Sequence, residues 1–110
     1  MSAPAQRGDQ SMPDEQALRD GAIVRKLCIC NRKGLHARAS AKFVQMVEKF
    51  DADVRVTRGG ETVGGTSIMG LMMLAASPGT SITVEATGRE AAEVVDALTT
   101  LIQTRFGEDD

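Results

Sequence analysis

The only histidine of the 110-residue chain stands where it could carry chemistry. His36 follows Gly34 and Leu35 and directly precedes a segment with helical periodicity, and Arg38 lies two residues further on. The first N–H groups of a helix lack partners within it and the helix dipole is positive there, so this position favours an anion such as phosphate. The same field disfavours imidazolium and leaves a neutral ring nitrogen free to attack a phosphoryl group. Arg38 could pair with phosphate oxygens through charge-assisted hydrogen bonds of about 1.5–3 kcal/mol each.

A second interpretation of His36 is purely structural. A solitary histidine near a helix N-terminus is often only a cap or a solvated loop residue. The residues themselves leave both interpretations open, although a histidine, a helix N-terminus and an arginine together suggest reversible phosphorylation.

The two cysteines, Cys28 and Cys30, lie two apart on a predicted strand. Residues at that spacing share a face with Cα atoms about 6.5–7 Å apart, which is awkward for a disulfide. A metal site would need further ligands, and His36 is the only histidine. We therefore expect two plain thiols, with a redox or metal-binding role as the alternative.

Alternation and helical periodicity together predict the elements that must position His36. Strands are expected at 23–30, 53–57, 62–63 and 81–86, and helices at 37–50, 67–76 and 89–106. The order βαββαβα, with strands apolar on one side, predicts an α+β fold: an open-faced sandwich with four antiparallel strands under three helices on one face. Cys28 and Cys30 would then lie on the open face.

The two ends of the chain carry no expected chemistry. Residues 1–22 lack hydrophobic periodicity and are expected to be a disordered tail, with one domain over 23–110. Gly107 suits the C-terminal cap of the last helix, and residues 108–110 are expected to trail into solvent.

Composition argues against several function classes. The formal charge is −2, from 13 basic and 15 acidic residues, which does not suggest a nucleic-acid surface or a polybasic membrane contact. No apolar run approaches the roughly 20 residues of a transmembrane helix, and residues 1–21 lack a signal-peptide core. An RNA-binding module of βαββαβ order would need aromatic residues on its sheet, and the chain has three Phe and no Trp or Tyr. We expect a soluble cytoplasmic protein with no nucleic-acid or membrane partner.

Two stretches carry a resemblance to a known family. GLHARAS followed by AKFVQMVEKF, from Gly34 to Phe50, resembles the active-site segment of HPr, the histidine phosphocarrier of the bacterial phosphotransferase system. GTSIMGLMML, from Gly65 to Leu74, resembles that family's regulatory-serine segment, at the family's interval from His36. The resemblance covers about residues 23–106 and implies an HPr-like fold.

The resemblance implies a role for the histidine segment. His36 would accept phosphate on Nδ1 from an enzyme I-type donor charged from phosphoenolpyruvate and pass it to an enzyme IIA-type acceptor, while Arg38 steadies the group. The protein would be a phosphocarrier with a covalent phosphohistidine rather than an enzyme, a monomer that needs no metal, nucleotide or other cofactor. Ala39 departs from the family, which commonly has proline there; this restores an N–H that could face phosphate. Ser40 replaces a small apolar residue, and its hydroxyl is expected to support the first helical turn.

The second stretch predicts regulation and docking. Ser67 is expected to cap the short helix and, by resemblance, to be phosphorylated by an HPr kinase/phosphorylase, which would weaken donor docking. Leu71 and Leu74 are expected to face the core. The expected partner-binding residues are Ala37, Ala41, Ile68, Met69 and Met72.

The pathway served stays open at this stage. TSIMGLMMLAASPG and the HARAS departure resemble HPr from alphaproteobacteria and favour a regulatory branch over sugar uptake. The alternative function is a regulatory binding protein whose phosphorylation controls a target without onward transfer.

Overall fold

The computed structural model describes residues 21–108. Residues 1–20 of the predicted tail lie outside that range, so the division into a tail and a domain stays a prediction. The elements within the described range are β1 (Ile23–Cys28), α2 (Ala37–Val47), β2 (Asp53–Arg58), β3 (Glu61–Gly64), α3 (Ile68–Met73), β4 (Ser81–Thr87), α4 (Ala91–Gln103) and the short 3₁₀ helix η1 (Arg105–Gly107).

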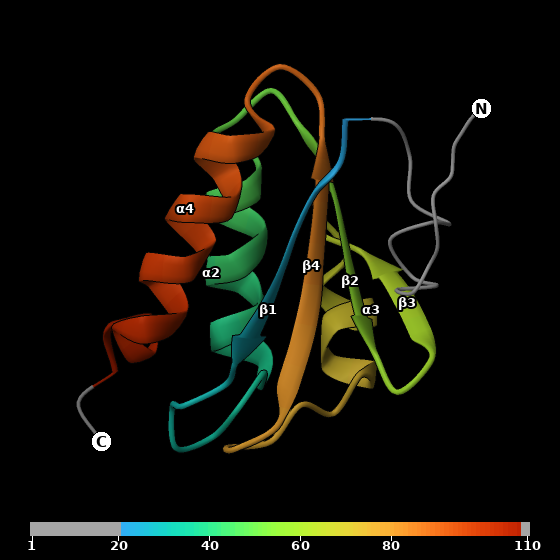
Figure 1. The fold of residues 1–110 in the computed structure, drawn as a ribbon. Helices are drawn as coiled ribbons and strands as arrows, with labels where there is room; N and C mark the ends of the chain where they lie inside the picture. Colours follow the sequence, from blue (N-terminus) through green and yellow to red (C-terminus); the bar gives the residue numbers. More distant parts are fainter. Residues whose placement is uncertain (1–20, 109–110) are drawn as a thin grey trace.

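The four strands form one antiparallel sheet in the order β1-β4-β2-β3. Helices α2 and α4 lie along one face of this sheet (Figure 1). The predicted α+β fold, with four antiparallel strands and three α-helices, is confirmed for the described residues. No helix in residues 21–108 combines the length and the apolar character needed to cross a bilayer.

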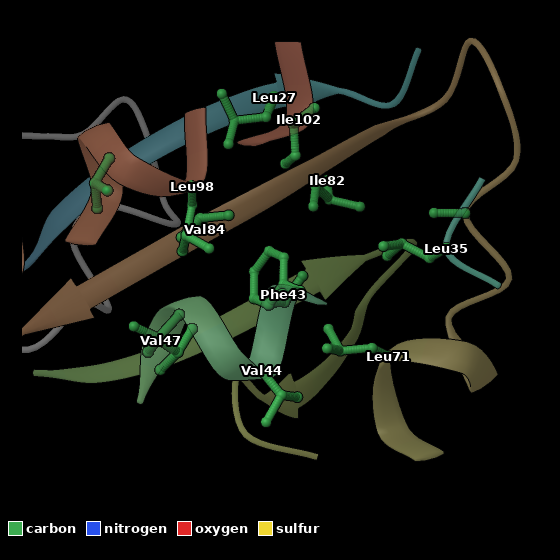
Figure 2. Packing of buried hydrophobic residues seen from close by; sticks show 14 of the residues in the cluster. Leu27, Leu35, Phe43, Val44, Val47, Leu71, Ile82, Val84, Leu98 and Ile102 are labelled. Carbon is green, nitrogen blue, oxygen red and sulfur yellow. The ribbon is translucent and has the colours of Figure 1, made fainter. Parts of the chain in front are cut away.

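The core lies between the helices and the inner face of the sheet. Alternate residues of β4, namely Ile82, Val84 and Ala86, are buried, as period-two alternation requires. Figure 2 shows Phe43 of α2 at the centre of this cluster, facing β4. Leu35, which immediately precedes His36, is buried in the same cluster and anchors the loop before α2.

Several element ends differ from the sequence predictions. The first strand ends at Cys28 rather than at residue 30, and α2 ends at Val47 rather than at 50. Helix α3 is confined to Ile68–Met73, and the chain leaves it through Ala75, which has a positive φ of 53°. The return strand β3 is longer than predicted because it pairs with β2 from Glu61 to Gly64.

The predicted last helix, 89–106, is two elements. Helix α4 ends at Gln103, because the backbone turns left-handed at Arg105 and Phe106, each with φ of 57°, and a right-handed helix cannot continue through that conformation. Gly107, with φ of 74°, therefore ends η1 rather than capping α4. This turn brings the chain back toward the start of α2.

Three separate segments meet at one end of the molecule. The loop after β1, the loop before β4 and η1 all lie at the lower end of the view in Figure 1, where α2 begins. That end carries the candidate site.

Candidate functional site

The loop that carries His36 is held by backbone bonds from a distant segment. Ile29 N–H donates to the Thr80 carbonyl at 2.8 Å, and Gly79 N–H donates to the Ile29 carbonyl at 2.8 Å. Leu35 N–H donates to the Ala76 carbonyl at 2.9 Å. The loop between β1 and α2 is therefore fixed against the loop between α3 and β4.

Gly34 is the residue that permits this close approach. Its φ is +64°, a conformation that favours glycine. A Cβ built at Gly34 would collide with the Ala76 carbonyl oxygen and lie 3.0 Å from Ser77 Cα. Any side chain at this position would push apart the two loops that place His36.

Asn31 fixes the loop from within. Its side chain is fully buried, and Nδ2 donates to the Gly34 carbonyl at 2.8 Å and to Glu108 Oε1 at 3.1 Å. Both neighbours are acceptors, so the amide has only one workable orientation. Its Oδ1 has no hydrogen-bond partner within residues 21–108, a loss that the loop tolerates to hold both contacts.

His36 is the N-cap residue of α2 but does not cap it. Its backbone is extended, with φ −75° and ψ −176°, and its side chain makes no capping hydrogen bond. Ser40 N–H bonds to the His36 carbonyl at 2.8 Å, whereas the N–H groups of residues 37–39 have no acceptor among the described residues. Three amides are thus left at the positive end of the helix, which is the arrangement that favours an anion.

Both residues at which the chain departs from the resembled pattern are buried in the first turn of α2. Ala39 is fully buried, and its N–H is one of the three amides without an acceptor in the described range. Ser40 is also fully buried, and its hydroxyl donates to the Leu35 carbonyl at 3.1 Å. The expected structural role of Ser40 is confirmed.

Glu108 lies against His36, and the prediction that it trails into solvent is wrong. Glu108 Oε2 lies 2.7 Å from His36 Nε2, and the Glu108 side chain is only 12% exposed. No hydrogen bond engages Nδ1 of His36 within the described part of the chain. The ring therefore has one nitrogen held and one nitrogen available.

The Glu108 carboxyl is ionised in this setting. Burial on its own would raise its pKa, but hydrogen bonds from His36 and Asn31 and the charges of His36 and Lys42 outweigh burial and lower the pKa below the ordinary value. An ionised carboxylate can only accept hydrogen bonds, so Nε2 carries a hydrogen in this contact.

Arg38 lies in the first turn of α2 with its side chain exposed. Its guanidinium makes no hydrogen bond or ion pair with any residue in 21–108, so all its donors are available to a ligand. The structure therefore places a half-exposed imidazole, three amides without acceptors and a guanidinium without a partner at one helix N-terminus.

Comparison with known proteins identifies the family. Residues 23–104 match the family described as PTS HPr component phosphorylation site. The phosphocarrier protein HPr of Cupriavidus necator is 48% identical over 86 residues, covering 78% of this chain and 97% of that protein. HPr of Neisseria meningitidis serogroup A is 54% identical over 80 residues, covering 73% of this chain and 90% of that protein. The chain belongs to the HPr family.

A solved structure supports the same assignment. The crystal structure of HPr from Thermoanaerobacter tengcongensis superposes with a TM-score of 0.76 at 38% identity, covering 80% of this chain and 99% of that one. The protein is thus an HPr-family phosphocarrier of the phosphotransferase system, and the open-faced sandwich predicted from its sequence is confirmed.

The second HPr-like stretch forms the start of α3. Ser67 caps this helix, because its Oγ accepts a hydrogen bond from Gly70 N–H at 3.0 Å. Leu71 and Leu74 are buried, as expected. The helix also presents four exposed apolar side chains, 38–69% exposed: Ile68, Met69, Met72 and Met73. We call these four residues the α3 patch; Met73 was not expected among them.

The remaining candidate residues are placed less distinctively. Ala37 is exposed and Ala41 half-buried on α2, which packs against α3. Cys28 and Cys30 are free thiols. Cys30 was expected on the open face, but it lies beyond the end of β1 and its Sγ donates to the Ile102 carbonyl of α4 at 3.2 Å. No cluster of potential metal ligands occurs within the described ranges.

Sequence reasoning missed Asn31, Lys42 and Glu108 as parts of the site. Asn31 was assigned only to a turn, and Glu108 was assigned to an acidic end. A usable signal was Phe106, a large apolar residue that must reach the core and so returns the chain to it. Its burial places the next residues beside α2.

Proposed function

We propose that this protein accepts a phosphoryl group on Nδ1 of His36 from an enzyme I-type donor charged from phosphoenolpyruvate. It then passes the group to an enzyme IIA-type acceptor. The observation that carries this proposal is the uncapped start of α2, where the imidazole lies beside amides that lack acceptors.

The transfer step uses the ring nitrogen that no described residue engages. The lone pair of Nδ1 attacks phosphorus, the Nδ1–P bond forms, and the bond between phosphorus and the donor's leaving nitrogen breaks. The free amides of the exposed residues 37 and 38 and the Arg38 guanidinium suit the charge on the phosphoryl oxygens. Ala39 carries an N–H that a proline would lack, but the residue is fully buried and this amide does not reach the surface.

Docking is assigned to the α3 patch together with Ala37 and Ala41. Flexible methionine side chains suit a surface that meets more than one partner, as a carrier between donor and acceptor must. An HPr kinase/phosphorylase acting on Ser67 would place nearly two negative charges at the edge of this patch and weaken docking.

The acceptor assignment is tested by labelling. Incubation with labelled phosphoenolpyruvate and the donor enzyme is expected to give an acid-labile adduct on the wild-type protein and none on His36→Ala. Unchanged circular dichroism of His36→Ala serves as the control for folding. An acid-labile label that persists on His36→Ala would show that the site is assigned wrongly.

A chase separates the two candidate functions. The labelled protein is mixed with an enzyme IIA-type protein, and transfer of label is expected if the chain is a relay. Retention of all label, with binding to a target that depends on phosphorylation, would support the regulatory binding protein instead. The uptake and regulatory branches differ only in which acceptor takes the label.

The docking assignment is tested with Ser67→Asp. Aspartate is as good an N-cap as serine, so this variant adds charge without opening α3. Affinity for the donor is expected to fall, while Thr100→Asp, on the exposed surface of α4, leaves it unchanged. Equal donor affinity of both variants would remove the support for docking through the α3 patch.

A further inference from the structure

The segment that carries Glu108 is held in an unfavourable backbone conformation. Arg105, Phe106 and Gly107 are consecutive left-handed residues, with φ of 57°, 57° and 74°. For a residue other than glycine this conformation costs roughly 1–2 kcal/mol. Such strain persists only where other contacts hold it, and it is concentrated at functional sites.

Two contacts hold this segment against α2. The Phe106 side chain is 1% exposed and belongs to the core, and Lys42 Nζ donates to the Phe106 carbonyl at 2.6 Å. Glu108 N–H closes the turn by donating to the Arg105 carbonyl at 2.9 Å. These contacts fix the path of the chain through the turn, and that path places Glu108 beside His36.

Both oxygens of the delivered carboxylate are engaged. Oε2 faces His36 Nε2 at 2.7 Å, and Oε1 accepts from Nδ2 of the buried Asn31 at 3.1 Å. Asn31 in turn holds the Gly34 carbonyl, so the loop before α2 and the turn after α4 share one hydrogen-bond network. The carboxylate cannot rotate away from Nε2 without losing the bond to Asn31.

We propose that Glu108 is a positioning residue that holds Nε2–H of His36, directs phosphorylation to Nδ1 and stabilises the positive charge that the ring gains on phosphorylation. The proposal rests on the acceptor role given to His36 above. It adds a physical reason why one ring nitrogen rather than the other reacts.

The chemistry follows from the proton on Nε2. When neutral His36 with hydrogen on Nε2 attacks through Nδ1, the Nδ1–P bond forms, the donor's P–N bond breaks, and the ring becomes a cation that retains Nε2–H. A carboxylate at 2.7 Å favours that cation. Loss of the group to an acceptor then breaks Nδ1–P and returns the neutral ring with the same hydrogen in place.

The other charged side chains on the elements that meet at this end are basic. Arg38 and Lys42 come from α2, Arg32 and Lys33 from the loop before it, and Arg105 from η1. The loop before β4 contributes no titratable side chain over residues 76–80. Glu108 is therefore the one acidic side chain that the described elements bring against His36.

The first test uses phosphoramidate, a small donor with a P–N bond that loses ammonia, so no partner protein is needed. The wild-type protein is expected to give Nδ1-phosphohistidine, as read by ³¹P and ¹⁵N NMR. Glu108→Ala should raise the share of Nε2 product several-fold. Glu108→Gln keeps only one acceptor, so an oxygen that faces Nε2–H leaves the amide NH2 facing Nδ2 of Asn31, and its share of Nε2 product should fall between those of the wild type and Glu108→Ala. Glu93→Gln, an exposed carboxylate on α4, is the matched control.

The second test measures cleavage of the N–P bond against pH. Both Glu108 variants are expected to move the pH midpoint of cleavage down, because they remove the negative charge that lies 2.7 Å from Nε2 of the phosphorylated ring. A merely structural role would leave this pH profile unchanged in Glu108→Gln, which removes the charge and keeps the size of the side chain.

The outcomes are decisive for the proposal. Wild-type product ratios in Glu108→Ala, or a wild-type pH profile in both variants, overturn it. A wild-type protein that reacts with phosphoramidate at Nδ1 but takes no label from the donor enzyme would refute the proposed relay and leave the role of Glu108 supported.

Discussion

Helices α2 and α3 begin in opposite ways, although both start at a residue that the sequence marks as functional. At α3 the Ser67 hydroxyl accepts from Gly70 N–H and closes the helix end with a neutral cap. At α2 the His36 side chain points to Glu108 instead, and the amides of residues 37–39 find no acceptor among the described residues.

The start of α3 is therefore stabilised by its own N-cap, whereas the start of α2 leaves its N–H groups for a ligand. A good N-cap is worth about 1 kcal/mol, and α2 forgoes it. An incoming phosphoryl group can supply the missing acceptors, whereas at α3 the cap already fills that position. At α3, the phosphate proposed for regulation would have to be attached covalently to the capping hydroxyl of Ser67.

The largest expected effect on stability comes from adding a side chain at Gly34. Gly34→Ala should lower the free energy of unfolding by about 3 kcal/mol, because a Cβ collides with the Ala76 carbonyl and the left-handed φ is unfavourable. Urea unfolding measures it. Gly79→Ala has a similar φ of +87° but open space, so it should show only the smaller conformational cost. Equal losses in both variants would contradict the proposed close contact.

Removing the guanidinium should affect transfer and leave the fold intact. Arg38→Ala is expected to slow phosphoryl acceptance about 10- to 100-fold, the equivalent of one lost charge-assisted hydrogen bond. Stopped-flow or quench measurements with the donor give the rate, and Arg38→Lys should recover part of it. A wild-type rate in Arg38→Ala would exclude Arg38 from the site.

The closed helix end should lose stability when its cap is removed. Ser67→Ala is expected to cost about 1 kcal/mol, while Ser67→Asp should unfold close to the wild type in urea. If Ser67→Ala is as stable as the wild type, the cap contributes nothing and the contrast between the two helices disappears.

The start of α2 should become more stable when residue 36 is changed to one that can cap the helix. His36→Ser should be about 0.5–1 kcal/mol more stable than His36→Ala, because both lack the ring and only serine can accept from the free amides. Both variants should fail to take the phosphoryl group. Equal stability would mean that the amides of residues 37–39 already have effective partners.

The smallest expected effect is on the free energy of unfolding at low pH. The pKa of Glu108 is lower in the folded protein than its ordinary value of 4.5, so its contribution to stability is present above about that pH and is lost as the pH falls through the lowered pKa. Urea titrations from pH 6 to pH 3 should therefore show a shallower loss for Glu108→Gln than for the wild type. The Ser67 cap does not titrate, so Ser67→Ala should keep the wild-type slope.

Much of the fold was predictable because its signals are local. Alternation in β4 and the apolar stripe of α2 follow directly from which face each element buries. His36 and Arg38 were likewise marked by their spacing at a helix start. The ends of elements were less predictable, because α4 ends where Arg105 and Phe106 adopt a left-handed backbone that their residue types do not favour.

The position of Glu108 beside His36 could not be predicted from the sequence, and the reason is physical. Glu108 reaches His36 through two consecutive left-handed residues that are not glycine, Arg105 and Phe106. Local preference argues against that turn, and the burial of Phe106, the bond from Lys42 and the bonds to the Glu108 carboxylate maintain it. Long-range contacts decided the outcome there.

The bracing of the His36 loop by residues 76–80 has a kinetic consequence. A peptide spanning residues 34–50 would contain the whole GLHARAS sequence and the first helix, but it would lack the backbone partners that residues 76–80 supply to the loop. Those partners join only when a long stretch of chain closes on itself, which is slower than local helix formation. The ability to take a phosphoryl group should therefore arise late in folding, after the helices have formed.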